Sequence, residues 1–155
     1  MGLNHDYLII DKSEFDVNGI SAYHHSNQAV LLHDDFISYI YDTLNWIPSY
    51  DPQSKKIQIG FDRWGPNIYD YESAEKLKTI FSSWANIFNE GPELLNLKGS
   101  WSYYNVDTDE YDDEGQYERL YYNRIEIVSN LNEIANWAVE VIESKGSKII
   151  LHLGI

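Results

Sequence analysis

The stretch NLNEIANWAVEVIESKGSKIILHL, residues 130–153, contains the two patterns that decide the fold. Its first part predicts a helix over residues 130–145, because its apolar residues recur on one face at helical spacing. Gly146 favours a helix end there, since glycine readily adopts the left-handed backbone conformation that terminates helices. The following KIILHL, residues 148–153, is apolar and β-branched, which is typical of a strand near the centre of a sheet. The fold must therefore combine helices with a sheet.

Helical spacing of apolar residues recurs in two earlier segments of the chain. One helix is expected over residues 34–46, and another carries an apolar stripe over residues 77–88. Side chains that can accept hydrogen bonds from free backbone N–H groups mark the expected helix starts. These are Asp70 or Ser73 for the second helix, and Ser129 or Asn130 for the helix over residues 130–145.

Short apolar or alternating runs predict strands between these helices. Strands are expected over residues 7–11, 56–61, 94–104, 117–128 and 148–153, whereas residues 19–32 fit either a strand or the start of a helix. This order of elements predicts an α+β fold, with residues 1–155 in a single domain. We expect a mixed or mostly antiparallel sheet with about three helices packed on it.

Composition and charge narrow the class of protein. The chain has 155 residues, the length of one ordinary domain, and carries 25 acidic against 11 basic residues. Its formal net charge of −14 argues against direct binding to nucleic acid and to anionic membranes, which both attract clustered lysine and arginine. The chain holds no cysteine, which excludes disulfides and thiolate chemistry. Because neither a leader nor an apolar run of about 20 residues is visible, we expect a cytoplasmic protein.

Sequence motifs of catalysis are not found in this chain. It contains neither the G-x-S-x-G turn of a serine nucleophile nor a glycine-rich phosphate loop. The one cluster that could bind a metal combines His24, His25 and His33 with Asp34 and Asp35. Adjacent side chains on a strand point to opposite faces, and the two aspartates suit the positive end of a helix. We therefore expect a protein that is not an enzyme and that holds no metal and no cofactor.

The most distinctive segment is DTDEYDDEGQYE, residues 107–118, which contains seven acids and no base. We expect residues 107–116 to form an acidic hairpin loop between two long strands. One interpretation is a loop that solvated, mutually repelling charges keep extended. The other is a docking surface for a basic partner, with tyrosines as packing anchors among the acids. The residues assigned to that surface are Asp107, Asp109, Asp112, Asp113, Glu114, Tyr104, Tyr111 and Tyr117.

The same acids allow a calcium interpretation. Counted from Asp107, carboxylates occupy positions 1, 3, 7 and 12 of a loop, and the last of them is Glu118. Against this, position 6 of a calcium loop requires glycine and here holds Asp112, and no helix pair flanks the segment. A calcium-binding module is therefore kept as an alternative.

A second candidate for recognition is the turn over residues 62–67, in which Gly65-Pro66 supplies typical turn chemistry. Arg63 and Trp64 lie at its tip, and both residue types are frequent in interface hot spots. The alternative, which we favour, packs Trp64 into the core and pairs Arg63 with Asp62. Three further tryptophans, on the predicted helix faces, are also expected in the core: Trp46, Trp84 and Trp137.

As a whole, the chain resembles the immunity proteins of bacterial polymorphic-toxin and contact-dependent inhibition systems. The resemblance is carried by residues 107–118 with their tyrosines and by the turn GFDRWGP, residues 60–66, in a small acidic domain without cysteine. It implies a cytoplasmic antidote that binds a cognate toxin domain, often a basic nuclease, and blocks its active site. Opposite net charges would steer such a pair together.

Other binding functions stay open from the sequence. An acidic chain can mimic nucleic acid and occupy a DNA-binding protein, but mimics spread their charge evenly along one face. Here the acids are uneven, with seven acids and one base in residues 1–50, seven and six in residues 51–100, and eleven and four in residues 101–155. That pattern favours a local docking surface. The tyrosine-rich strands are equally compatible with a homodimer.

Overall fold

The closing strand β8 (Lys148–Leu153) lies inside the main sheet, as its apolar sequence predicts. In the computed structural model, which describes residues 3–24, 26–54 and 56–155, β8 pairs with β1 (Asn4–Asp11) on one side and with β5 (Asn67–Tyr69) on the other. Five of its six residues are buried, since both faces of the sheet are covered at this point. A strand buried on both faces is expected to be apolar throughout rather than alternating.

The described residues form a six-stranded sheet in the order β2-β1-β8-β5-β3-β4, and every pairing in it is antiparallel. Three strands complete the sheet around those already named: β2 (Val30–His33), β3 (Pro48–Asp51) and β4 (Lys56–Ile59). The predicted α+β class and antiparallel sheet are thus confirmed. Two short strands, β3 and β5, were not expected from the sequence, because runs of three or four residues carry little periodic signal.

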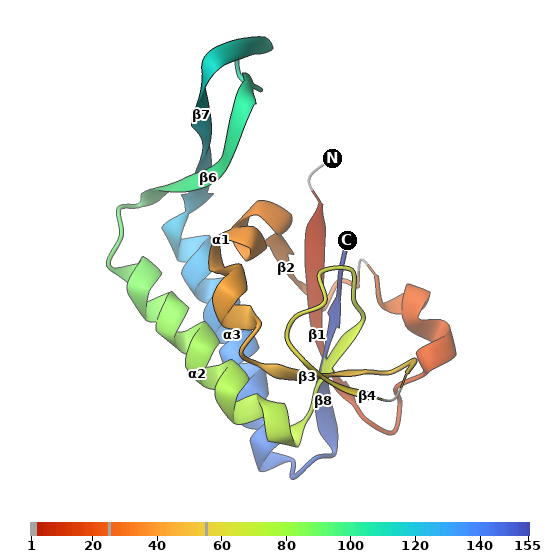
Figure 1. Cartoon of the computed structure of the whole chain (residues 1–155). Coiled ribbons are helices and arrows are strands. Elements are labelled where there is room, and N and C mark those ends of the chain that lie inside the picture. The colour runs from red at the N-terminus through yellow and green to blue at the C-terminus, as the bar shows by residue number, and fades with distance from the viewer. Residues whose placement is uncertain (1–2, 25, 55) are drawn as a thin grey trace.

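Three α-helices cover one face of the sheet (Figure 1). They are α1 (Asp34–Leu44), α2 (Tyr71–Asn89) and α3 (Arg124–Glu143), and their apolar stripes join β1, β2 and β8 in the main core. The other face carries a smaller core, against which the 3-10 helix η1 (Val17–Tyr23) packs through Ile20 and Tyr23. The ambiguous segment 19–32 therefore contains both a helical turn and a strand. Within the described residues, no helix has the length and apolar character that crossing a membrane requires.

Side-chain caps fix where the helices begin. Asp70 accepts hydrogen bonds from the backbone N–H groups of Glu72 and Ser73 at the start of α2, as one of the two expected caps. The start of α3 differs from the prediction, because the cap is Asn123 and not Ser129 or Asn130. Six residues expected in a strand, 123–128, thus form the cap and the first turn of a helix.

The physical reason for this error lies in the sequence RIEIV of residues 124–128. Alternating β-branched residues are typical of a strand. In the structure, however, the Asn123 side chain accepts a hydrogen bond of 3.2 Å from the N–H of Glu126, and Ile127 and Leu131 are buried one turn apart. Capping and burial in the core outweigh a weak local preference.

A long hairpin stands apart from the main sheet (Figure 1). Its strands are β6 (Leu94–Asn105) and β7 (Glu110–Asn123), so only residues 106–109 connect them. The expected acidic loop over residues 107–116 is therefore mostly strand, and the hairpin turn is much shorter than predicted. The Asn105 side chain accepts hydrogen bonds from the N–H groups of Asp107 and Thr108, and Asp109 adopts a positive φ of 58°. These features close a tight turn, and the acids of the outer part of β7, residues 110–114, stay in solvent on both faces of the ribbon.

The tryptophans divide between core and surface. Trp137 is buried, and Trp84 is partly buried with its indole N–H donating to the Thr43 hydroxyl at 2.8 Å. Trp46, in contrast, is 61% exposed, which contradicts the expected core position. The reason is that α1 ends at Leu44, so Trp46 lies beyond the helix whose buried face it was expected to extend.

The cap of α3 gives a direct test of the fold. We expect Asn123→Ala to lower the free energy of unfolding by about 1 kcal/mol, because the N–H of Glu126 loses its acceptor. Urea denaturation of the purified protein measures this. Ser129→Ala is the matched control, since Ser129 is exposed inside the helix and alanine is the better helix former. A loss of stability in the control and not in Asn123→Ala would place the helix start where the sequence alone suggested.

Candidate functional site

The hairpin over residues 94–123, called the arm from here on, presents most of the residues that the sequence assigned to a docking surface. Apolar side chains hold its inner end to the body. Leu95 and Leu120 are buried, and the partly buried Leu97 and Tyr122 pack against the main core. Farther out, the arm projects from the body and is mostly solvent-exposed (Figure 1). It therefore combines a fixed base with an accessible outer part.

Aromatic side chains line the outer arm in ordered pairs. The ring of Trp101 meets that of Tyr117 edge-on at 4.8 Å between centroids, and the ring of Tyr104 lies 5.2 Å from that of Tyr111. The Lys98 ammonium lies 4.0 Å from the Tyr117 ring centre, a cation–π contact. These contacts hold the rings in place although Trp101 is 49% and Tyr111 82% exposed. Ordered, exposed rings lose little further entropy when a partner covers them.

A close approach between strands supports this arrangement. Gly115 has a positive φ of 69°, and a Cβ atom added to it would come within 2.8 Å of the Trp101 indole. Only glycine leaves room for that ring to lie against the backbone of β7. The position of Trp101 is therefore built into the arm.

Charge on the arm is concentrated in one strand and the turn. The arm contains seven acids and two bases, and its first strand, β6, has Lys98 but no acid. Asp107 and Asp109 lie in the turn, and Asp112, Asp113 and Glu114 are exposed on β7. The Tyr104 hydroxyl donates a hydrogen bond to the Asp109 carboxylate, which raises the pKa of that tyrosine. The eight arm residues predicted from the sequence thus belong to one projecting element.

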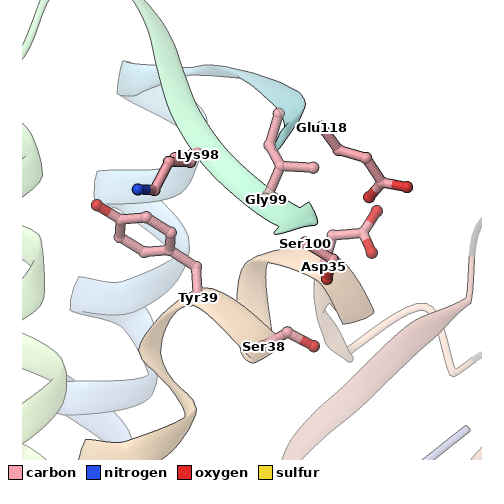
Figure 2. A pocket seen from close by; sticks show the side chains of 8 residues that line it. Asp35, Ser38, Tyr39, Lys98, Gly99, Ser100 and Glu118 are labelled. Carbon is pink, nitrogen blue, oxygen red and sulfur yellow. The ribbon is translucent and has the colours of Figure 1, made fainter. Parts of the chain in front are cut away.

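A hollow of about 250 Å³ lies where the arm meets α1. Figure 2 shows the carboxylates of Asp35 and Glu118 directed toward one another at one end, and the Lys98 ammonium near the Tyr39 hydroxyl at the other. The lining residues come from three elements: Asp35, Ser38 and Tyr39 of α1, Lys98, Gly99 and Ser100 of β6, and Glu118 and Leu120 of β7. Two facing carboxylates suit a cationic group, such as the side chain of lysine or arginine.

This hollow continues along the arm. A second hollow of about 410 Å³ shares Asp35, Glu118 and Leu120 with the first and extends to Val106 and Asp107 of the turn. The two hollows adjoin through these shared residues, and the second is also lined by Arg119. A convex surface of a partner would meet acids at both ends of the joined hollows.

A chain of buried polar groups runs beneath the first turn of α1. His5 Nε2 lies 2.9 Å from the Asp34 carboxylate, and His5 Nδ1 lies 2.8 Å from His152 Nε2. Asn67 Nδ2, a pure donor, lies 2.9 Å from His152 Nδ1. Outside this chain, Arg63 forms an ion pair with Asp34 and donates to the Ser38 hydroxyl at 2.8 Å.

The hydrogen-bond donors fix the proton positions in this chain. Because Asn67 donates to His152 Nδ1, the proton of neutral His152 sits on Nε2 and points at His5 Nδ1. The proton of His5 is then on Nε2 and points at Asp34. Every group from Asn67 to Asp34 thus has a partner when both histidines are neutral.

Burial and hydrogen bonding set the pKa values of these groups. Burial lowers the pKa of His152 well below 6.5, and the charge of His5 lowers it further. Burial also lowers the pKa of His5, although the hydrogen bond to Asp34 opposes this shift. For Asp34, burial acts to raise the pKa, but the hydrogen bonds from Arg63 and His5 outweigh it and hold the pKa below its ordinary value.

The turn residues Arg63 and Trp64 separate in the structure. Arg63 pairs with Asp34 and not with Asp62, so the favoured sequence interpretation was wrong for its partner. It was wrong for Trp64 as well, because that side chain is 71% exposed and not in the core. The backbone explains both outcomes, since the Asp62 carboxylate accepts a hydrogen bond of 3.0 Å from the N–H of Trp64 and closes the turn on itself.

The histidines considered as metal ligands have other roles. His33 caps α1 by accepting a hydrogen bond from the N–H of Asp35, and the side chain of His24 lies 4.0 Å from that of Asp6. His25, the remaining member of that cluster, lies outside the described residues. Across residues 3–24, 26–54 and 56–155, no group of three or more histidine or acidic side chains is arranged to hold a metal ion.

Sequence reasoning missed the buried histidine chain and both hollows. His5 and His152 are 147 positions apart, and each occupies a single place in an otherwise ordinary strand. The hollow pairs Asp35 with Glu118, which only the packing of the arm against α1 brings together. A histidine inside the apolar run KIILHL was the one available signal, because a fully buried histidine needs a polar partner.

No protein-family model matches the chain, and neither the curated proteins nor the solved structures contain a match to it. The fold and site define an α+β domain with an antiparallel sheet and an acidic, aromatic arm.

The buried histidines make stability depend on pH. We expect the free energy of unfolding to fall as the pH decreases from 7 to 5.5, by up to about 1.4 kcal/mol per pH unit for each histidine. The unfolded chain binds protons near pH 6.5, whereas the lowered pKa values of His5 and His152 keep the folded chain from doing so. Denaturation at several pH values measures this slope.

A single substitution tests whether the buried histidines cause this dependence of stability on pH. His152→Gln removes the histidine whose pKa is lowered more strongly, and we expect the variant to be less stable and to have a clearly smaller slope than the wild type. NMR titration of the wild-type His152 ring provides an independent measurement, and we expect its pKa to lie well below the ordinary value of 6.5. An unchanged slope in the variant, together with a His152 ring that titrates near pH 6.5, would contradict the assignment.

Proposed function

We propose that this chain is an immunity protein that binds and neutralises a cognate bacterial toxin domain, with a basic nuclease as the expected partner. The observation that carries the proposal is the arm, on which ordered, exposed aromatic rings stand among acidic side chains. The protein would act in the cytoplasm as a binding protein and not as an enzyme. Its docking surface is the arm together with the hollow at its base.

Charge supports a basic partner. A nuclease must attract phosphate and therefore carries a positive surface, whereas this chain has a net charge of −14. Seven acids on one projecting element place negative charge where a partner arrives first. Complementary charges of this kind raise the association rate and are screened by salt.

The aromatic side chains supply the contact area that charge alone lacks. Tyrosine and tryptophan dominate the binding energy of many interfaces, because their large, stiff side chains bury much surface at a small entropic cost. Trp101 and Tyr117 already contact each other, and Tyr104 and Tyr111 form a second pair. In a complex, the partner would cover these rings while lysine and arginine side chains reach the surrounding acids.

The hollow at the base of the arm has the chemistry to hold one cationic side chain. Asp35 and Glu118 would bind the charged end, while Tyr39 and Leu120 line the hollow for its aliphatic stem. A lysine or arginine seated there is a means of blocking an enzyme that uses such residues to bind phosphate. The buried histidine pair has a structural role in this proposal, since both rings are shielded from solvent.

Co-expression with the product of the adjacent open reading frame tests the function. We expect that product to stop growth when it is expressed alone, and growth to recover when this chain is expressed with it. A harmless neighbour, or failure of rescue when both proteins are made, would contradict the proposal.

Charge reversal tests the surface. We expect Asp113→Lys combined with Glu114→Lys to weaken binding to the purified toxin domain at least about tenfold, or about 1.4 kcal/mol, and to flatten its salt dependence. Both residues are exposed on β7, so the fold should be unaffected. Binding is measured by calorimetry at several salt concentrations, and rescue of growth is scored in parallel.

The matched control changes the net charge equally but away from the arm. Glu133→Lys with Glu143→Lys reverses two exposed acids on α3. We expect this pair to reduce long-range attraction slightly and to leave growth rescue intact. Equal losses in the two pairs would mean that overall charge, and not the arm, determines affinity.

A further inference from the structure

Hydrogen bonds and close packing hold the backbone of the loop that displays Trp64. Asn67 Nδ2 donates to the Asp62 carbonyl at 2.7 Å, and the N–H of Gly65 donates to the same carbonyl at 3.1 Å. On its other side, the loop lies against Gly154: a Cβ atom on Gly154 would overlap the backbone of Arg63 and Trp64. The conformation of the loop is therefore set by contacts of its backbone, and the Trp64 side chain takes no part in setting it.

The Trp64 ring is open to contact with a partner. Trp64 is 71% exposed, more than Trp46 or Trp101. Tryptophan is the residue type most enriched at the energetic centre of interfaces, and a loop whose backbone is already held adds little ordering cost on binding. The geometry thus presents an anchor that the core does not use.

Arg63 connects this loop to the hollow at the base of the arm. Its guanidinium pairs with Asp34, the first residue of α1, and donates to Ser38 one turn later. Ser38 also lines the hollow, together with Glu118 of the arm. Arg63 is a positioning residue, because its ion pair with Asp34 and its hydrogen bond to Ser38 tie the loop to α1. Asp34 also neutralises its positive charge.

We propose that the Trp64 loop and the arm form one continuous docking surface across the first turn of α1, and that Trp64 is its apolar anchor at the end opposite the arm. This inference rests on the proposed function and names the second half of the same site. The occupant is the basic toxin domain. Three acids lie between the two halves, namely Asp35, Asp62 and Glu118. Of the two bases nearby, Arg63 pairs with Asp34, and the Lys98 ammonium lies over the Tyr117 ring.

The two halves should contribute differently to binding. The arm acts through charge, so its variants change the association rate and the salt dependence. Trp64 acts by burial of an apolar ring, which changes the dissociation rate and is insensitive to salt. This difference separates a true second anchor from a general loss of attraction.

The test uses Trp64→Ala in the full chain, with the purified product of the adjacent open reading frame as the probe. We expect at least a tenfold faster dissociation by surface plasmon resonance, with an unchanged association rate and an unchanged salt dependence. Trp46→Ala is the matched control, because Trp46 is also exposed but lies on the groove between α1 and α2. Thermal unfolding of both variants verifies that each is folded.

The outcomes distinguish the inference from the proposed function. If charge reversal on the arm weakens binding and Trp64→Ala does not, the inference is overturned and the proposed function stands. If the probe does not bind the wild-type chain, both are overturned. If Trp46→Ala accelerates dissociation as much as Trp64→Ala does, the docking surface is not the one proposed. A stable homodimer that loses its contacts in Trp64→Ala would assign the loop to self-association and would also overturn the inference.

Discussion

The buried hydrogen-bonded chain that runs from Asp34 through His5 and His152 to Asn67 is the constraint on which the arrangement of this domain depends. It joins α1, β1, β8 and β5 through polar groups that are buried from water, and Arg63 pairs with its Asp34 end from the partly exposed loop before β5. Leaving one such group without a partner costs about 1–3 kcal/mol, so the elements must meet in one register. The hydrogen bond between His5 and Asp34 ties β1 to the first residue of α1, the helix that His33 caps, and Asp35 and Ser38 of the same helix line the hollow at the base of the arm. Hydrogen bonds in the core thus help to place the residues of α1 that line the hollow.

Much of the fold follows from local patterns in the sequence. The α+β class, the antiparallel sheet, the central place of β8 and the cap of α2 were all predictable, since each depends on periodicity or on one capping side chain. The start of α3 was not, because RIEIV alternates like a strand until its packing is known. Trp46 shows the same limit, since a helix that ends two residues earlier turns a core residue into a surface one.

The candidate site was predictable only in its charged part. A run of acids with tyrosines is visible in any sequence, and the structure places these residues on one arm. The hollow is a different matter, because Asp35 and Glu118 are far apart in the chain and meet only through the packing of the arm on α1. The partner of Arg63 was also hidden: Asp62 is the nearer acid in sequence, but its carboxylate closes the turn, and Asp34 comes close only when the sheet has formed.

The arm also affects how readily copies of this protein associate with one another. A two-stranded ribbon leaves backbone N–H and C=O groups along both outer edges, and such edges pair readily with another copy of the same strand. At neutral pH the carboxylates of β7 keep two ribbons apart by mutual repulsion. Near the sequence pI of about 4.5, the net charge of the whole chain approaches zero, so long-range repulsion between copies is lost while the edges and exposed rings remain. We therefore expect isoelectric precipitation to begin with contacts between the arms of two copies.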